Sequence, residues 1–272
     1  MIWQTCLLKG RCVIMIENIK VGLALSGGAA RGFAHIGVLK VIDEAGIKID
    51  CLAGTSMGAL IGALYASGLK VKVMDRLMRA AGSVSWLDFV FPRMGLIKGE
   101  KIEEIVRLLT RRSTFEQLRI PLAVVAVDLY SGEKVVLNEG LVCRAVRASI
   151  SIPGFFVPLV VDNRLLVDGG VLDRIPIEVA REMGANVIIA VDTGIYKRNT
   201  KFNSVLDVVT RSFDIMQQEI CRSQLTKTDL VISPELDIAP SQFERAAEAI
   251  DAGERAARET LPQILALLEQ RK

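Results

Sequence analysis

Short apolar runs alternate with amphipathic stretches along the first part of the chain. Residues 21–26 form one such run and predict a buried strand. Helical spacing over residues 33–45 follows and stops at Gly46, a residue that favours a helix C-terminus. Residues 47–53 predict a second strand, and a helix of small residues follows it as far as Ser67. This order of strand, helix, strand and helix predicts an α/β fold with a parallel sheet and right-handed crossovers.

The rest of the chain continues in the same way. We expect helices over residues 71–81, 101–112, 141–149, 177–183 and 204–224, and one or two terminal helices over residues 242–268. We expect strands over residues 122–127, 134–137, 164–167, 187–191 and 230–233. Continuous apolar runs are typical of strands that are buried on both faces of a sheet. The composition shows no break that would mark a linker. We therefore expect one domain over residues 21–272 and a poorly ordered N-terminal extension over residues 1–20.

Composition narrows the class of protein. Hydrophobic residues make up 51% of the 272 positions, enough for a large core, and no run reaches the roughly 18 apolar residues of a membrane span. The net charge of +3 is too small to indicate a nucleic-acid-binding protein. The five cysteines include no C-x-x-C pair, which argues against a disulfide framework and against a metal site. We expect a protein of a reducing compartment, cytoplasmic or peripheral at the inner face of a membrane.

One serine lies in a pattern that indicates a nucleophile. The segment Gly54-Thr55-Ser56-Met57-Gly58 matches G-x-S-x-G between a predicted strand and a predicted helix. In such an elbow the serine sits on a strained turn, and the glycines at 54 and 58 let neighbouring backbone pass closely. The following helix N-terminus favours negative charge on the hydroxyl oxygen. The pattern therefore indicates Ser56 as a nucleophile, and the alternative is an ordinary serine in a tight turn.

A glycine-rich turn follows the first predicted strand and opens the first predicted helix. Its residues are Gly27, Gly28, Ala29, Ala30, Arg31 and Gly32. Backbone N–H groups at such a place can bind an anion. The turn lacks the G-x-G-x-x-G of a dinucleotide site and the Gly-Lys of a P-loop. We interpret it as an oxyanion hole, against the alternative of a structural turn, with Arg31 either orienting the loop or meeting a phosphate headgroup.

The base that would activate the serine is less obvious. The single histidine, His35, falls in the first turn of a predicted helix among apolar residues, a setting more typical of packing than of a catalytic triad. Without it, a carboxylate must take the serine proton directly. Asp168 is the strongest candidate, because it ends a predicted strand and precedes Gly169 and Gly170, which leave space around it. The alternative is a simple Asp-Gly loop turn. The competing carboxylates are Asp128, Asp162, Asp173 and Asp192.

The glycine-rich turn is followed along the chain by the serine elbow, the block at residues 148–154 and the Asp-Gly-Gly motif. This series of motifs resembles the patatin-like phospholipase family, in its short single-domain bacterial form. The resemblance implies a three-layer α/β/α fold with a mainly parallel central sheet. It also implies a Ser56–Asp168 dyad that hydrolyses phospholipids, lysophospholipids or acylglycerols through an acyl-enzyme, without metal or cofactor. The sequence departs from the family pattern at Ala29, where a third glycine is common.

Two other functions remain open at this point. The same dyad serves thioesterases and transacylases, and a protein of this fold can be non-catalytic and regulatory. The expected partners are a lipid or acyl-ester substrate and a membrane surface contacted peripherally, with no nucleic acid. The aromatic segment over residues 86–97 predicts either a lipid-contacting flap or a stretch packed on the core. The residues concerned are Trp86, Phe89, Phe91, Leu96 and Ile97.

Overall fold

The computed structural model describes residues 6–8, 11–13, 19–81, 88, 94–194 and 205–271. Its centre is an eight-stranded sheet whose main order is β10-β9-β3-β4-β5-β8-β7, with β6 paired to β5. Five neighbouring strands are parallel: β10 (Leu230–Ile232), β9 (Val187–Val191), β3 (Val21–Leu25), β4 (Cys51–Thr55) and β5 (Leu122–Asp128). Three are antiparallel to their neighbours: β6 (Lys134–Leu137), β7 (Leu159–Val161) and β8 (Arg164–Asp168). The sheet is therefore mixed but mostly parallel.

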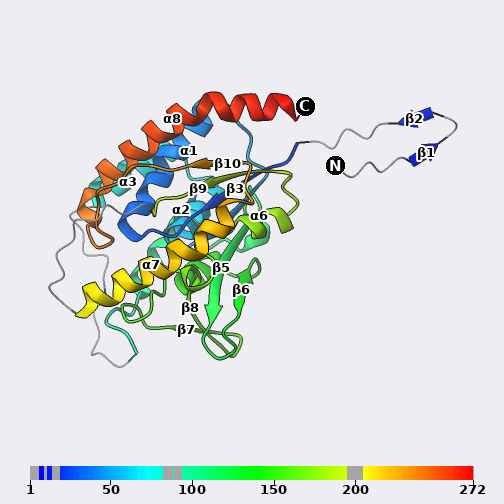
Figure 1. The fold of residues 1–272 in the computed structure, drawn as a ribbon. Coiled ribbons are helices and arrows are strands. Elements are labelled where there is room, and N and C mark those ends of the chain that lie inside the picture. Colours follow the sequence, from blue (N-terminus) through cyan, green and yellow to red (C-terminus); the bar gives the residue numbers. More distant parts are fainter. Residues whose placement is uncertain are drawn as a thin grey trace.

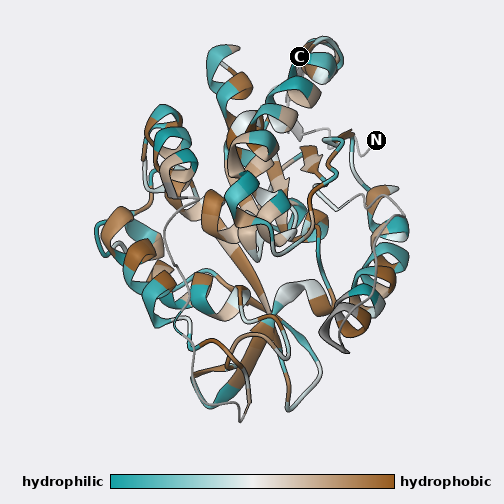
Figure 2. Ribbon diagram, turned by 90° about the vertical axis from the view of Figure 1, so that its left-hand side faces the viewer, coloured by the Kyte–Doolittle hydropathy of each residue, from teal (hydrophilic) through white to brown (hydrophobic). Residues whose placement is uncertain are grey.

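Helices cover both faces of this sheet (Figure 1). One face packs against α1 (Ala34–Glu44), α2 (Met57–Ala66), α3 (Val71–Ala81), α4 (Glu100–Leu109), α5 (Val142–Ser149) and α8 (Ala246–Gln270). The other packs against α6 (Ile177–Glu182) and α7 (Val205–Leu225). The long central strand is brown, and the helices around it carry both teal and brown turns (Figure 2). The expected three-layer α/β/α fold is confirmed.

The two faces of the sheet carry side chains of different size. In β3, Leu23 and Leu25 point into the larger core under α1, α2 and α8, while Ala24 points toward α6. The same alternation in β4 puts Leu52 on the first side and Ala53 on the second. Because side chains alternate across a strand, the small residues share one face, which lets α6 approach the sheet closely.

Some element boundaries differ from the expectation. The predicted strand over residues 47–53 begins only at Cys51 and continues through Thr55, while Ile47 and Ile49 are buried from the preceding loop. The predicted helix over residues 101–112 ends at Leu109, because Arg111 and Arg112 adopt positive φ angles of 55° and 58° that a helix does not allow. Strand β7 is not predicted by the pattern at all.

Most of the predicted N-terminal extension lies outside the described residues. Besides residues 19 and 20, its described parts are β1 (Cys6–Leu8) and β2 (Arg11–Val13), which pair antiparallel as a separate two-stranded sheet. The proposed boundary at residue 21 coincides with the start of β3 and stays a prediction. Among the described residues, none of the helices combines the length and the apolar content that a membrane span requires.

Candidate active site

Strand β5 brings two strand ends together. On one edge of β5, parallel β4 ends with Thr55 opposite Val125, and antiparallel β8 ends with Asp168 opposite Ala126. Strand β6 pairs with β5 over residues that also pair with β4 and with β8, so β6 must lie on the other edge of β5. Strands β4 and β8 therefore share one edge, and their ends meet there. Ser56 follows Thr55 directly. The register of the sheet therefore places Ser56 and Asp168 at one junction, although they come from strands far apart in the sequence.

Ser56 occupies a sharp turn between β4 and α2. Its backbone angles are φ 53° and ψ −121°, a conformation that residues with a side chain rarely adopt. The flanking glycines are needed sterically. A Cβ at Gly54 would lie 2.7 Å from the Ala59 Cα, and a Cβ at Gly58 would lie 2.6 Å from the Ser26 carbonyl oxygen. These contacts are the close backbone approach that the G-x-S-x-G pattern predicts.

The Asp168 side chain is buried against the serine. It is 3% exposed, and its Oδ1 accepts a 2.7 Å hydrogen bond from the Gly170 N–H. Burial raises the pKa of Asp168 from 3.8 to about 6, opposed by hydrogen bonds from the Ser56 hydroxyl and the Gly170 amide and by the charge of Arg174. Gly169 follows without a side chain because a Cβ there would overlap the Val125 carbonyl group.

The amides of the glycine-rich turn are partly engaged inside the protein. Gly27 donates to the Arg174 carbonyl at 3.0 Å, Ala30 to the Pro240 carbonyl at 3.1 Å, and Arg31 to the Gly28 carbonyl at 3.0 Å. The Gly28 and Ala29 amides donate to no acceptor in the described part of the chain. The turn lies beside the nucleophile, since a Cβ at Gly27 would be 3.3 Å from the Ser56 Cβ. Gly28 and Ala29 are therefore the candidate donors to an anion at this place.

Two buried arginines hold the glycine-rich turn in place through an ion pair and hydrogen bonds. The Arg31 guanidinium is buried and forms an ion pair with Asp214 of α7 at 3.6 Å. Its Nε also donates to the Gly28 carbonyl at 3.4 Å. Of the two roles considered for Arg31, this geometry supports orienting the loop. The Arg174 Nε donates to the Gly27 carbonyl at 3.0 Å, so Gly27 and Arg174 are joined by two hydrogen bonds.

His35 is fully buried at the start of α1. Its Nε2 donates a 2.8 Å hydrogen bond to the Ser26 carbonyl oxygen, and its Nδ1 has no partner in the described part of the chain. Burial lowers the pKa of His35 to about 4, so the ring is neutral near pH 7. No hydrogen bond within the described residues joins His35 to Ser56 or Asp168. This environment is that of a packing residue.

The competing carboxylates are engaged elsewhere or exposed. Asp128 accepts hydrogen bonds in the turn after β5, and Asp162 lies on the exposed turn between β7 and β8. Asp173 pairs with Lys134 at 2.9 Å, and Asp192 pairs with Arg174 at 3.4 Å. Asp168, in contrast, ends the strand that meets β4 at Ser56, and the Ser56 side chain acts to lower its pKa. Over the described residues, no group of three His, Cys, Asp or Glu side chains is placed to hold a metal ion.

Several residues around this junction carry no signal in the sequence patterns above. The Ser149 hydroxyl accepts the Ser56 N–H at 2.8 Å, and the Gln217 side chain of α7 donates to the Gly170 carbonyl at 2.8 Å. Arg174 joins the glycine-rich turn to the loop after Asp168. They act through backbone atoms, so no spacing pattern marks them, although Ser149 lies within the block at residues 148–154.

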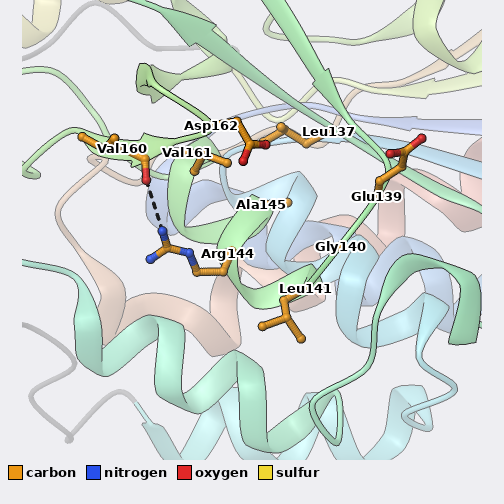
Figure 3. Close-up of a pocket in the computed structure, with 9 residues that line it drawn as sticks. All are labelled: Leu137, Glu139, Gly140, Leu141, Arg144, Ala145, Val160, Val161 and Asp162. Carbon is orange, nitrogen blue, oxygen red and sulfur yellow. Dashed lines mark hydrogen bonds between the residues drawn. The ribbon is translucent and has the colours of Figure 1, made fainter.

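A surface pocket of about 300 Å³ opens at the start of α5, between β6 and β7 (Figure 3). Arg144 reaches across it and donates to the Val160 carbonyl at 3.1 Å. Neither Ser56 nor Asp168 lines this pocket. The candidate chemistry therefore rests on the strand junction and not on the pocket.

The aromatic segment expected as a flap is described only in part. Trp86, Phe89 and Phe91 lie outside the described residues. Leu96 is half-buried and Ile97 is buried, and the amides of both donate to the Phe155 carbonyl. The described end of this segment thus packs on the body of the protein.

The sequence of this chain is similar to the sequences of known proteins. An uncharacterized NTE family protein of Mycobacterium bovis is 40% identical over 178 residues, which cover 63% of this chain and 48% of that protein. Lysophospholipase NTE1 of Mycosarcoma maydis is 35% identical over 183 residues, covering 65% of this chain and 10% of that protein. The chain thus spans about half or less of the length of these relatives.

Similarity extends to solved structures at low identity. VipD from Legionella pneumophila superposes with a TM-score of 0.49 and 14% sequence identity, over 89% of this chain and 67% of that one. A family model described as patatin-like phospholipase matches residues 23–181, which include the glycine-rich turn, the serine elbow and the Asp-Gly-Gly motif. The match covers more than half of the chain and confirms the resemblance seen in the motifs: the chain belongs to the patatin-like phospholipase family.

Proposed function

We propose that this chain is a serine hydrolase of lipid carboxylic esters, in which Ser56 is the nucleophile and Asp168 is the general base. The observation that carries the proposal is the junction of β4 and β8, where the strand register brings Ser56 to the buried Asp168 carboxylate. Membership of the patatin-like phospholipase family supports a lipid substrate. A relative named as a lysophospholipase favours a lysophospholipid or phospholipid among such esters.

The reaction begins at the serine oxygen. As Oγ of Ser56 attacks the ester carbonyl carbon, the Asp168 carboxylate accepts the hydroxyl proton. The tetrahedral intermediate collapses, the alcohol or lysolipid leaves with the proton from Asp168, and the acyl group stays on Ser56. A water molecule then attacks the acyl-enzyme while Asp168 takes its proton. As the bond between Ser56 Oγ and the acyl carbon breaks, Asp168 returns this proton to Oγ, and the fatty acid is released. No step requires an imidazole between the two side chains.

Burial makes Asp168 a better base than an exposed aspartate. An ordinary carboxylate near pKa 4 is a poor proton acceptor for a serine hydroxyl. With its pKa raised to about 6, Asp168 is still ionised at pH 7 and is closer to the basicity that general-base catalysis favours. In this proposal the proton passes directly between the two groups, which the ends of β4 and β8 bring to one junction.

The oxyanion is held by the Gly28 and Ala29 amides in this proposal. Both belong to the turn that packs beside Ser56 and have no acceptor among the described residues. Arg31, Arg174 and Asp214 hold the turn in place through buried contacts, so its donors are fixed before substrate binds. Such preorganised donors typically contribute on the order of 100-fold or more in rate each.

The test is ester hydrolysis by the wild type and three variants, with a p-nitrophenyl ester and a lysophospholipid as substrates. Ser56→Ala and Asp168→Asn should each lose about 1,000-fold or more in kcat, as loss of a nucleophile or its base does in other serine hydrolases. His35→Gln keeps a donor for the Ser26 carbonyl and should retain wild-type activity. Loss of activity in His35→Gln with an intact fold, or full activity in Asp168→Asn, would contradict the proposal.

A further inference from the structure

Ser149 is the last residue of α5 and is fully buried. Its Oγ accepts a 2.8 Å hydrogen bond from the Ser56 N–H and donates a 2.6 Å hydrogen bond to the Val125 carbonyl oxygen. The hydroxyl therefore stands between the backbone of the candidate nucleophile and the backbone of β5. Both of its hydrogen-bonding partners are main-chain atoms of buried residues.

The Ser149 hydroxyl lies where the ladder between β4 and β5 ends. Thr55 opposite Val125 is the last pair of the ladder between β4 and β5, and the chain then turns sharply at Ser56. The Ser56 N–H has left the ladder but remains buried, where an unpaired donor is costly. The Ser149 hydroxyl supplies the acceptor and connects the N–H back to β5. It thus extends the sheet by one bridging group at the point where the elbow begins.

Strain at Ser56 makes this support relevant to chemistry. A residue at φ 53° and ψ −121° keeps that conformation only where its surroundings enforce it. On the C-terminal side, α2 does so, because the Leu60 N–H donates to the Ser56 carbonyl at 3.1 Å. On the N-terminal side, the Ser149 hydroxyl is the group bonded to the Ser56 N–H.

The same stretch of chain also contacts the candidate base. The Asp168 N–H donates to the Ser151 carbonyl oxygen at 3.0 Å, two residues beyond Ser149. Residues 149–151 therefore hold the main chain of both Ser56 and Asp168 at the junction of β4 and β8. A shift at this stretch changes the position of one side chain relative to the other.

We propose that Ser149 is a positioning residue, whose hydroxyl holds Ser56 in the strained conformation that directs its Oγ toward Asp168. This inference rests on the proposed function of the Ser56–Asp168 pair. Ser149 is itself fully buried, so it has no surface to offer a substrate. Its loss should therefore lower kcat and leave KM nearly unchanged.

The experiment compares Ser149→Ala with Ser149→Thr and with a control that loses a similar hydroxyl elsewhere. The control is Thr110→Val, because the Thr110 hydroxyl is buried and donates only within its own helix region, to the Val106 carbonyl at 2.7 Å. Two quantities are measured: kcat and KM for a p-nitrophenyl ester, and the rate at which a fluorophosphonate probe labels Ser56. Circular dichroism and thermal melting establish that each variant is folded.

We expect Ser149→Ala to lose at least tenfold in both kcat and labelling rate, with KM within threefold of the wild type. Ser149→Thr, which keeps the hydroxyl, should recover most of both rates, and Thr110→Val should keep them. If Ser149→Ala does not fold, Ser149→Cys replaces it, since a thiol is a weaker donor and acceptor of similar shape, and the same loss is expected. Unchanged rates in the folded variant would overturn the inference.

The outcomes also separate this inference from the proposed function. A wild type that hydrolyses the ester and reacts with the probe, together with an unchanged Ser149→Ala, would leave the proposed function intact and remove only the role of Ser149. A wild type inert to both reagents would overturn the proposed function and the inference with it. An equal loss in Thr110→Val would assign the effect to general destabilisation and would overturn the inference alone.

Discussion

The variant Asp168→Asn tests whether Asp168 is ionised in the folded protein. The quantity measured is the free energy of unfolding, so no substrate is needed. Asparagine has nearly the shape of aspartate, and its side-chain oxygen can still accept the hydrogen bond that the Gly170 N–H donates to Asp168. The substitution therefore removes the charge at nearly constant shape and replaces the second carboxylate oxygen with an NH2 donor. If the carboxylate is ionised at a cost in the folded protein, the variant should be more stable than the wild type above the pKa.

The size of the effect follows from the raised pKa. Burial moves the pKa of Asp168 from 3.8 to about 6. At about 1.36 kcal/mol per pKa unit, ionising this group costs the folded protein up to about 3 kcal/mol at pH 8. Because the folded pKa lies above the unfolded one, the folded state binds more protons between the two values. This contribution to stability is present at low pH and is lost as the pH rises through about 6.

Urea unfolding of the wild type and Asp168→Asn at pH 5 and pH 8 measures this directly. The variant should be more stable by up to about 3 kcal/mol at pH 8, and by roughly half of that at pH 5, where the unfolded carboxylate is already ionised and the folded one is not. An equal gain at both pH values, or a loss at pH 8, would refute the reasoning, because neither depends on a buried ionised carboxylate.

Asp128→Asn serves as a control with the opposite sign. Although burial acts to raise the pKa of Asp128, hydrogen bonds from Tyr130, Ser131 and Leu165 hold it below its ordinary value. A lowered pKa means that ionisation stabilises the folded state above the unfolded pKa, and that this contribution is lost as the pH falls. Asp128→Asn should therefore be destabilised more at pH 8 than at low pH, whereas Asp168→Asn should behave in the opposite way.

Three further predictions follow from the site. The kcat/KM should rise about tenfold per pH unit below an apparent pKa near 6 and level off above it, because Asp168 must be ionised to accept the proton; a flat profile between pH 5 and 8 would contradict this role. Ala29→Gly should raise stability by about 1 kcal/mol in urea unfolding, since Ala29 has a φ of 48°, and a lower midpoint would contradict the strain. Gly58→Ala should lower the free energy of unfolding by about 3 kcal/mol or prevent folding, because its Cβ would overlap the Leu25 carbonyl oxygen. The control Gly62→Ala, in the same helix, meets only side-chain atoms from 3.4 Å and should be neutral or stabilising in thermal melting.

Elements with a clear hydrophobic period were predictable from the sequence. The boundaries of α3, β6 and β9 agree with the pattern residue by residue, because α3 has apolar residues at helical spacing and the two strands are short apolar runs with polar flanks. The direction of β8 was not predictable, since strand orientation depends on which edge is available and not on local spacing. Yet this direction is what brings Asp168 to Ser56.

The site was predictable only where a side chain follows a pattern. Ser56 and Asp168 stand in motifs, and the strand register brings them to one junction, while the dyad that the family resemblance implies stays a prediction. The support around them was not predictable, because it is made by backbone contacts over long separations. Ser149 bonds to a residue 93 positions away, and Arg174 to one 147 positions away. For Arg31, the sequence left two roles open, and the ion pair with Asp214 supports one of them.

The geometry of β5 also bears on why a histidine is dispensable in the proposed mechanism. In a triad, an imidazole with a pKa near 6.5 stands between serine and carboxylate, and the carboxylate orients it and stabilises its protonated form. Here β4 and β8 end at successive positions along one edge of β5, which brings Ser56 and Asp168 to one junction. Burial then raises the pKa of Asp168 to about 6, close to that of an imidazole. The strand register thus supplies the proximity, and the burial that comes with it supplies the basicity that a histidine otherwise provides.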